Sequence, residues 1–297
     1  MTSDHFVDGN WTSEDGLTLH FRDYAARDDV SDKRPPILCL HGLTRNVRDF
    51  AGFAERFSGE WRVIVPEMRG RGDSNYATGS ESYNVGQYVR DVQALLDQEK
   101  IDRYVAIGTS MGGLMTLVQA AQDASRLAGV VLNDIGPAIE AAGLDKIREY
   151  VGQGRNFPTW IHAARALADT HGEAHPGYAT QDWIAMAKRV MVLGPNGRIS
   201  FDYDMKIAEP ILQSDDAAAP ADLWPALDAM KDRPVLMVRG ALSNLLSQAT
   251  FDEMKRRLPD AETVTVADTG HAPTLDEPEA VEAIERLLDR VAAESRR

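Results

Sequence analysis

The stretch that decides the fold is Gly108-Thr109-Ser110-Met111-Gly112-Gly113. Residues 104–107, directly before it, are rich in β-forming side chains and predict a short buried strand. After it, apolar residues recur at helical spacing over residues 114–121. Ser110 is therefore expected at a turn from strand to helix. A Gly-x-Ser-x-Gly match requires this context, because so tight a turn needs glycine where larger side chains would clash.

Such a turn exposes the Ser110 hydroxyl at the edge of a sheet. The amide of Met111 would lie beside it at a helix N-terminus, where a backbone N–H can stabilise an oxyanion. A second oxyanion donor is expected in the loop after the apolar strand 37–40, where the amide of Leu43 follows His41-Gly42. We expect His41 itself to hold the shape of this loop. The sequence thus predicts a nucleophilic serine with two N–H donors.

A serine nucleophile needs a base, and histidine is the usual one because its pKa lies near neutrality. His271 lies just after the last expected strand, 263–266. The carboxyl ends of parallel strands meet at one edge of a sheet, so His271 and Ser110 are expected on the same edge. His171 and His175 have the i, i+4 spacing of a helical metal pair, but Gly172 interrupts the helix, so no metal site is predicted.

Composition narrows the class of protein. The chain has 297 residues, 43% of them hydrophobic, and a net charge of -14. This charge argues against nucleic acid and anionic membranes as partners. The one cysteine, Cys39, excludes an internal disulfide and indicates a reducing compartment. The first twenty residues lack the features of a signal peptide, and no apolar run reaches the roughly 20 residues of a membrane span. We therefore expect a cytoplasmic protein.

Apolar strands alternate with amphipathic helices along most of the chain, which predicts an α/β fold with a mostly parallel, doubly covered sheet. A hairpin is expected at 11–24, where a strand of alternating pattern suits a sheet edge. The rhythm changes between residues 138 and 228, where helices follow one another and no strand of the earlier type occurs. We predict a core of residues 1–137 and 229–297 with a helical lid, 138–228, inserted between them.

Taken together, these motifs resemble the α/β-hydrolase fold superfamily. The resemblance covers nearly the whole chain and is carried, in order, by His41-Gly42, Arg69-Gly70-Arg71-Gly72-Asp73-Ser74, Gly108-Thr109-Ser110-Met111-Gly112 and Gly270-His271. It implies a doubly wound sheet of eight strands and a triad of serine, histidine and acid. The lid matches only in position and helical character.

The third member of the triad is where the chain departs from the family. The family usually carries an acid in the loop after the strand 235–238, but this chain has Asn244 at the expected position. In a serine protease, asparagine in place of the triad acid lowers turnover about 10⁴-fold. Some members use a carboxylate at the end of the strand after the serine, where this chain has Asp134. The sequence does not decide which of the two residues takes the place of the triad acid. We hypothesise that position 244 still occupies the acid's place, and Asn244 far from His271 would contradict this.

The expected activity is hydrolysis of a carboxylic ester or lactone through an acyl-enzyme on Ser110, for which no cofactor is needed. A carbon-carbon bond hydrolase acting on ring-fission products is the enzymatic alternative. A binding protein that has lost turnover is another, because Asn244 would suit it. Oligomeric state is left open.

The substrate is expected to be a small and mainly apolar molecule, because the lid is rich in aromatic side chains. Trp160, Trp183, Met186 and Met191 could line a pocket, although such stripes are more typical of a plain core. Arg45 follows the oxyanion loop and could contact a substrate carboxylate, although a solvated surface charge is the simpler interpretation.

Overall fold

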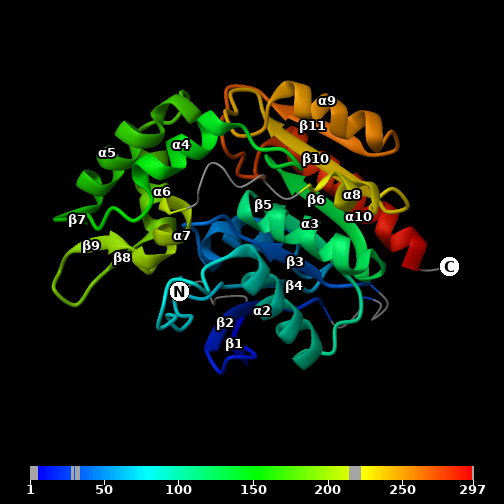
Figure 1. Cartoon of the computed structure of the whole chain (residues 1–297), viewed down its shortest axis with the longest axis horizontal. Coiled ribbons are helices and arrows are strands. Elements are labelled where there is room, and N and C mark those ends of the chain that lie inside the picture. Colours follow the sequence, from blue (N-terminus) through cyan, green and yellow to red (C-terminus); the bar gives the residue numbers. More distant parts are fainter. Residues whose placement is uncertain (1–5, 28–29, 31–33, 214–221, 296–297) are drawn as a thin grey trace.

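An eight-stranded sheet runs through the computed structural model of the chain and is covered by helices on both faces (Figure 1). The structure describes residues 6–27, 30, 34–213 and 222–295. The strand order is β1-β2-β4-β3-β5-β6-β10-β11. The strands β1, β2 and β4 pair antiparallel, and all pairs from β4 to β11 are parallel. The fold class expected from the sequence is therefore confirmed.

The strands of this sheet are β1 (Val7–Thr12), β2 (Thr18–Tyr24), β3 (Ile37–Leu40), β4 (Val63–Pro66), β5 (Tyr104–Thr109), β6 (Leu127–Asn133), β10 (Val235–Gly240) and β11 (Glu262–Val266). The helices around it are η1 (Val47–Phe50), α1 (Ala51–Phe57), α2 (Val85–Gln98), α3 (Met111–Asp123), η2 (Ala124–Arg126), α8 (Trp224–Asp228), α9 (Gln248–Arg257) and α10 (Pro278–Ser295). The expected hairpin at 11–24 corresponds to β1 and β2.

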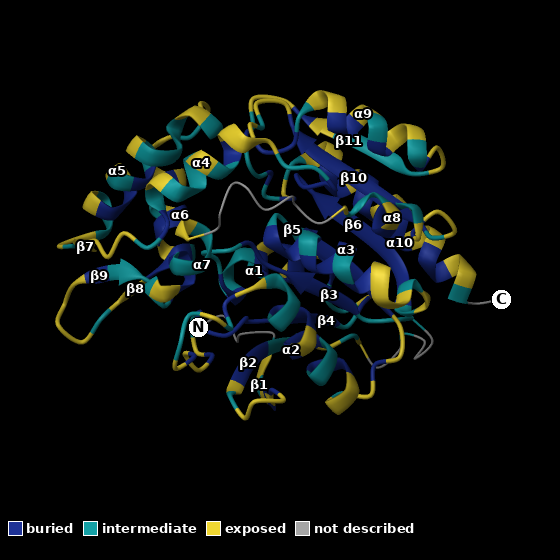
Figure 2. Cartoon of the chain, in the orientation of Figure 1, coloured by how far each residue is buried: buried dark blue, intermediate teal, exposed yellow. Residues whose placement is uncertain are grey.

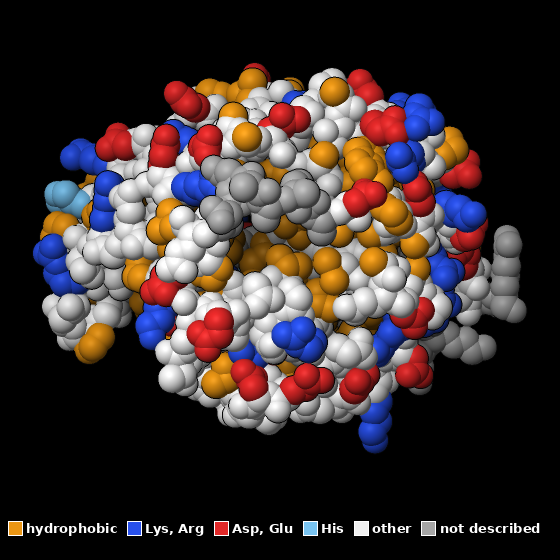
Figure 3. Space-filling model, viewed as in Figure 1, with side chains coloured by type: hydrophobic (Ala, Val, Ile, Leu, Met, Phe, Trp, Pro, Cys, Tyr) orange, Lys and Arg blue, Asp and Glu red, His pale blue; other side chains and the backbone are white. Residues whose placement is uncertain are grey.

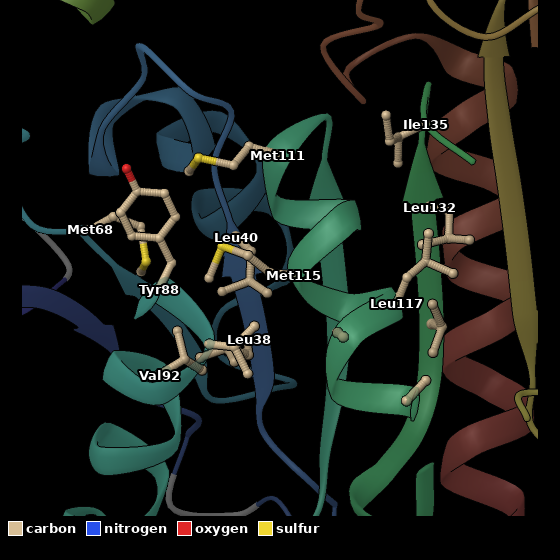
Figure 4. Close-up of a cluster of buried hydrophobic side chains, with 14 of the residues drawn as sticks. Leu38, Leu40, Met68, Tyr88, Val92, Met111, Met115, Leu117, Leu132 and Ile135 are labelled. Atoms are coloured by element: carbon tan, nitrogen blue, oxygen red, sulfur yellow. The ribbon is translucent and has the colours of Figure 1, made fainter. Parts of the chain in front are cut away.

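The central strands are apolar at most positions because both of their faces are buried. In β3, Leu38 and Leu40 join the cluster that packs under α2, α3, α8 and α9, and Ile37 and Cys39 join the cluster under α1 and α10. Figure 4 shows Leu38 and Leu40 facing side chains of α2 and α3. Figure 2 shows the result for the whole molecule, with buried strands in the middle and exposed residues on the outer sides of the helices.

A separate layer of helices lies between β6 and β10 in the sequence and beside the sheet in space (Figure 1). We refer to residues 141–212 as the insert. Its elements are α4 (Ala141–Tyr150), β7 (Asn156–Phe157), α5 (Trp160–His171), η3 (Gly172–Ala174), α6 (Thr180–Val190), β8 (Met191–Leu193), β9 (Ile199–Phe201), η4 (Met205–Ala208) and α7 (Glu209–Leu212).

The insert differs from its sequence expectation in two respects. It contains a small antiparallel sheet of order β7-β9-β8, which the sequence pattern missed because strands of two or three residues show no periodicity. The helix α8 falls within the range 138–228 but packs against α3 of the core. Residues 214–221 of that range lie outside the described residues. Among the described helices, none has both the length and the apolar composition needed to cross a bilayer.

Candidate active site

Ser110 lies at a sharp turn between the end of β5 and the start of α3, as expected. Its backbone adopts φ +53° and ψ -114°, a conformation that few non-glycine residues occupy. The flanking glycines allow the turn to pack closely. A Cβ atom at Gly108 would lie 2.5 Å from the backbone of Gly112, and one at Gly112 would clash with the carbonyl oxygen of Leu40 in β3. The tight turn presents the Ser110 hydroxyl beyond the carboxyl edge of the sheet.

A chain of hydrogen bonds links Ser110 to a histidine and a buried carboxylate. The Nε2 atom of His271 lies 2.8 Å from the Oγ atom of Ser110. Its Nδ1 atom lies 2.7 Å from the Oδ2 atom of Asp134. This geometry suits a neutral imidazole that donates from Nδ1 to Asp134 and accepts the Ser110 proton at Nε2. Asp134 is fully buried directly after β6, whereas 16% of the His271 side chain remains exposed.

Asp134 is held by the loop that follows β10. The Gly240 backbone N–H donates to Oδ1 at 2.8 Å, and the Ser243 hydroxyl donates to Oδ2 at 2.6 Å. The carboxylate therefore accepts two bonds from this loop besides its contact with His271. Such bonds fix the direction in which the carboxylate points.

The hypothesis that position 244 occupies the acid's place is wrong for this structure. Asn244 is exposed in the loop after β10, and no hydrogen bond of its side chain occurs among the described residues. The strand order places the end of β6 beside the Ser110 turn at the end of β5. His271, from the loop after β11, reaches Asp134 at this position with its Nδ1 atom. The loop after β10 contributes Gly240 and Ser243 to the support of Asp134 instead.

Two backbone amides beside Ser110 are free to bind an oxyanion. The N–H groups of Leu43 and Met111 form no hydrogen bond with the described part of the chain. His41 is buried beneath this loop, with Nδ1 2.7 Å from the Gly42 oxygen and Nε2 accepting the Met68 N–H at 3.1 Å. Burial lowers the pKa of His41 to about 4, so the ring is neutral and can make both contacts. The expectation that His41 shapes the loop agrees with this arrangement.

The insert and the core enclose a cavity at Ser110, which we refer to as the insert cavity. It is lined by Gly42, Leu43, Thr44, Arg45, Asp49, Phe50, Thr109, Ser110, Ile147, Tyr150, Leu167, His171, His175, Tyr178, Met186, Arg189, Val190, Phe201, Tyr203, His271, Ala272, Pro273 and Thr274. The Arg45 guanidinium is paired with Asp49 at 3.2 Å and lies in the cavity wall, so the interpretation of Arg45 as a simple surface charge does not hold.

Two histidines of the insert face the same cavity in their neutral form. Burial, reinforced by the nearby Arg45, lowers the pKa of His171 to about 3 and that of His175 to about 4. The helix α5 ends at His171 and Gly172 begins a 3-10 turn, so the two residues do not share one helix. His175 stacks on Tyr178 and contacts the edge of Trp183.

The tryptophans suggested as substrate contacts belong to the core of the insert. Trp183 is 6% exposed and packs with Met186 and Met191, and Trp160 packs against the same cluster. Of these four residues only Met186 also lines the insert cavity. The alternative interpretation, a plain core, therefore describes the two tryptophans, because the insert needs its own apolar centre to be stable beside the sheet.

Sequence comparison agrees with this geometry. A model of the alpha/beta hydrolase family matches residues 37–284. The chain belongs to this family. A crystal structure of an alpha/beta hydrolase from Novosphingobium aromaticivorans is 54% identical and superposes with a TM-score of 0.91, covering 97% of this chain and 99% of that one. The family resemblance proposed from the motifs is thus confirmed.

Two curated relatives of this alpha/beta hydrolase have named activities. The 3-hydroxybutyrate-oligomer hydrolase of Cupriavidus necator is 34% identical over 88% of this chain and 90% of its own length. Esterase YbfF of Escherichia coli is 25% identical over 92% of this chain and its full length.

Sequence reasoning missed two residues at the site. One is Ser243, whose hydroxyl donates to Asp134 Oδ2 from the loop after β10. Asn133 was also missed. It is fully buried, and its Nδ2 atom donates to Thr109 Oγ1 at 3.0 Å and to the Pro273 oxygen at 2.8 Å. It thereby joins the segment before Ser110 to the segment after His271, a link between distant residues that no local pattern reveals.

Proposed function

We propose that this alpha/beta hydrolase cleaves a carboxylic ester or lactone through an acyl-enzyme on Ser110. The observation that carries the proposal is the hydrogen-bonded chain from Ser110 Oγ through His271 to Asp134, at 2.8 and 2.7 Å. The free amides of Leu43 and Met111 support it, because acyl transfer needs donors where negative charge develops. The names of the two curated relatives support it further, since they describe an oligomer hydrolase and an esterase.

In this mechanism the base is His271. It takes the Ser110 proton as Oγ attacks the carbonyl carbon, and Asp134 stabilises the imidazolium that forms. The Leu43 and Met111 amides bind the oxyanion of the tetrahedral intermediate. His271 then gives its proton to the leaving oxygen, and the acyl group stays on Ser110. Water, activated by the same imidazole, hydrolyses the acyl-enzyme and restores the Ser110 hydroxyl.

The alternative of a binding protein without turnover was based on Asn244 at the expected position of the acid. The contact of Asp134 with His271 Nδ1 weakens this alternative, because it supplies a carboxylate from another position. A carbon-carbon hydrolase would use the same serine and histidine, so a vinylogous diketone is tested beside simple esters. A preference for the diketone would replace the ester proposal.

The test combines covalent labelling with turnover. We expect a fluorophosphonate to label Ser110 and the protein to hydrolyse p-nitrophenyl butyrate. Ser110→Ala should abolish labelling and lower kcat/KM by about 10³-fold or more, because the triad acts as a unit. Ser125→Ala, at an exposed serine of η2, is the matched control. Absence of both labelling and turnover in the folded protein would refute the proposal.

A further inference from the structure

Two hollows of different chemistry meet at Ser110. The insert cavity lies on one side, and an open groove lies on the other. The groove is lined by Leu43, Tyr83, Asn84, Val85, Tyr88, Ser110, Met111, Leu114, Ile135, Ile139, Leu144, Ile147, Arg148, Pro210, Ile211 and Leu245. Leu43, Ser110 and Ile147 line both. Figure 3 shows hydrophobic side chains gathered in a hollow at the middle of the face that α3 and the insert share. A substrate held at Ser110 can therefore extend in two directions.

The groove is almost entirely apolar. Its walls include aliphatic side chains of α3, of the segment after β6 and of α4, and Arg148 is paired with Asp145 at 3.0 Å. The groove therefore suits the apolar half of a substrate, because burial of apolar surface is its main source of binding energy.

The insert cavity offers a positively charged lining that can bind an anion. Its charged lining consists of Arg45, Arg189 and Asp49, so a positive charge remains after the Arg45–Asp49 pair. The Nε atom of Arg189 is buried and has no hydrogen-bond partner in the described part of the chain. His171 and His175 add neutral rings that can donate a hydrogen bond without adding charge. Such a set fits a carboxylate, for which an arginine is the preferred partner.

The position of His271 decides which half of an ester enters which space. His271 lines the insert cavity and not the groove, whereas Met111 lines the groove and not the cavity. The leaving oxygen must lie next to His271 Nε2, which supplies its proton. The alcohol half of the ester therefore points into the insert cavity. The acyl half points away from His271, past Met111, and follows the groove.

We propose that the substrate class is an O-acylated hydroxy acid, with an apolar acyl chain in the groove and a free carboxylate of the alcohol half at the Arg45 and Arg189 guanidiniums. This inference rests on the serine-ester activity proposed above and specifies its substrate. Attack of Ser110 Oγ on the ester breaks the bond between the carbonyl carbon and the alkoxy oxygen. That oxygen takes the proton from His271, and a hydroxy acid leaves. Water then releases the acyl chain as a carboxylic acid.

Three small substrates test the placement of the carboxylate. Butyryloxyacetate carries it on the alcohol half, monoethyl succinate carries it on the acyl half, and butyryloxyacetamide replaces it by a neutral group of similar shape. We expect kcat/KM to be highest for butyryloxyacetate, by about 10-fold or more over each of the others. Equal rates for the three, or a preference for monoethyl succinate, would overturn the inference. The Ser110 mechanism would survive either result, because ester hydrolysis would still occur.

Substitution of Arg45 tests the partner of the carboxylate. Arg45→Gln should lower the ratio of kcat/KM for butyryloxyacetate to that for butyryloxyacetamide by about 10- to 100-fold, the worth of a charge-assisted contact. The ratio separates loss of charge recognition from general damage to the neighbouring oxyanion loop. Arg165→Gln, at an exposed arginine of α5 outside both spaces, should leave the ratio unchanged. An unchanged ratio in Arg45→Gln contradicts the assignment.

Filling the groove tests the place of the acyl chain. Leu144, on α4, lines the groove but not the insert cavity. Leu144→Trp should lower kcat/KM for a hexanoyl ester relative to the acetyl ester by about 10-fold, with the same alcohol in both. Leu193→Trp, at a residue of β8 that is 58% exposed, is the control and should not change this ratio. If Leu144→Trp discriminates among alcohols instead of acyl chains, the two halves are reversed and the inference fails.

Discussion

At the scale of single residues, the chemistry of the site depends on how one carboxylate is oriented. Asp134 contacts His271 through Oδ2, and the loop after β10 binds both of its oxygens through Gly240 and Ser243. An acid at the end of β6 thus occupies the position beside the histidine that the resemblance to the family had assigned to the loop after β10. Asn244, in that loop, remains exposed to solvent.

The acid's position can be tested by exchanging the two side chains. Asp134→Asn should lower kcat/KM on p-nitrophenyl butyrate by about 10³- to 10⁴-fold, because the imidazolium loses its counter-charge and the ring its tautomer. Asn244→Asp should give no gain over the parent. A rise of about 100-fold in Asn244→Asp would show that the acid acts from position 244 after all. Recovery of activity in the double variant would lead to the same conclusion.

At the scale of elements, the Ser110 turn depends on the close approach of α3 to β3. The first turn of α3 rests on the backbone of β3 at Gly112, where no side chain fits. Apolar side chains pack in a cluster on each face of the sheet and hold these elements in contact. The sharpness of the turn is therefore maintained by packing from both sides of the sheet as well as by local sequence.

We expect Gly112→Ala to destabilise the protein more than any mild substitution on the surface. The added methyl would overlap Leu40 of β3, and overpacking of this kind costs about 1–3 kcal/mol or more. For a chain of this size the melting temperature should fall by about 2–5 °C, which differential scanning calorimetry can measure. Gly172→Ala is the matched control, since a Cβ there meets nothing within 4 Å. An equal Tm for both variants would contradict the packing argument.

At the scale of the whole molecule, contacts between the insert and the core complete the site. Arg48 of η1 pairs with Asp202 at 2.7 Å and also donates to backbone oxygens of Arg189 and Met191. The Gly270 N–H, next to His271, donates to the Ala174 oxygen at 2.6 Å. The insert is thereby joined to the loop that carries His271. This closure also buries His175 and partly buries His171, and both lie in the cavity wall.

Burial of neutral histidines predicts how stability depends on pH. His41 and His171 have folded-state pKa values of about 4 and about 3, below the 6.5 of an unfolded histidine. Between pH 6.5 and 4 the unfolded chain therefore binds more protons, and stability falls as the pH falls. Burial lowers the pKa of His20, but its hydrogen bonds to Glu67 and Asp8 raise this pKa overall. The effect of His20 on stability is therefore in the opposite direction.

We expect the free energy of unfolding to be lower at pH 5 than at pH 7, by on the order of 2 kcal/mol for each such buried histidine. Urea titrations at the two pH values measure the difference. His171→Phe removes one of these groups and should reduce the difference between the two pH values by about 2 kcal/mol, the contribution of one histidine. Equal free energies of unfolding at pH 5 and pH 7 would show that the neutral histidines do not cause a loss of stability at acidic pH.

The sheet, the serine turn and the histidine loop could be predicted from the sequence alone. These features are local, because a tight turn demands glycine and a strand covered on both faces favours a continuous apolar run. From the sequence, either Asp134 or Asn244 could be the partner of His271, and the tryptophans of the insert could either line a pocket or form a core. These points required the tertiary structure. The partner of His271 depends on which residues the segments after β6 and β11 bring into contact, and the lining of the cavity depends on how the insert packs on the core.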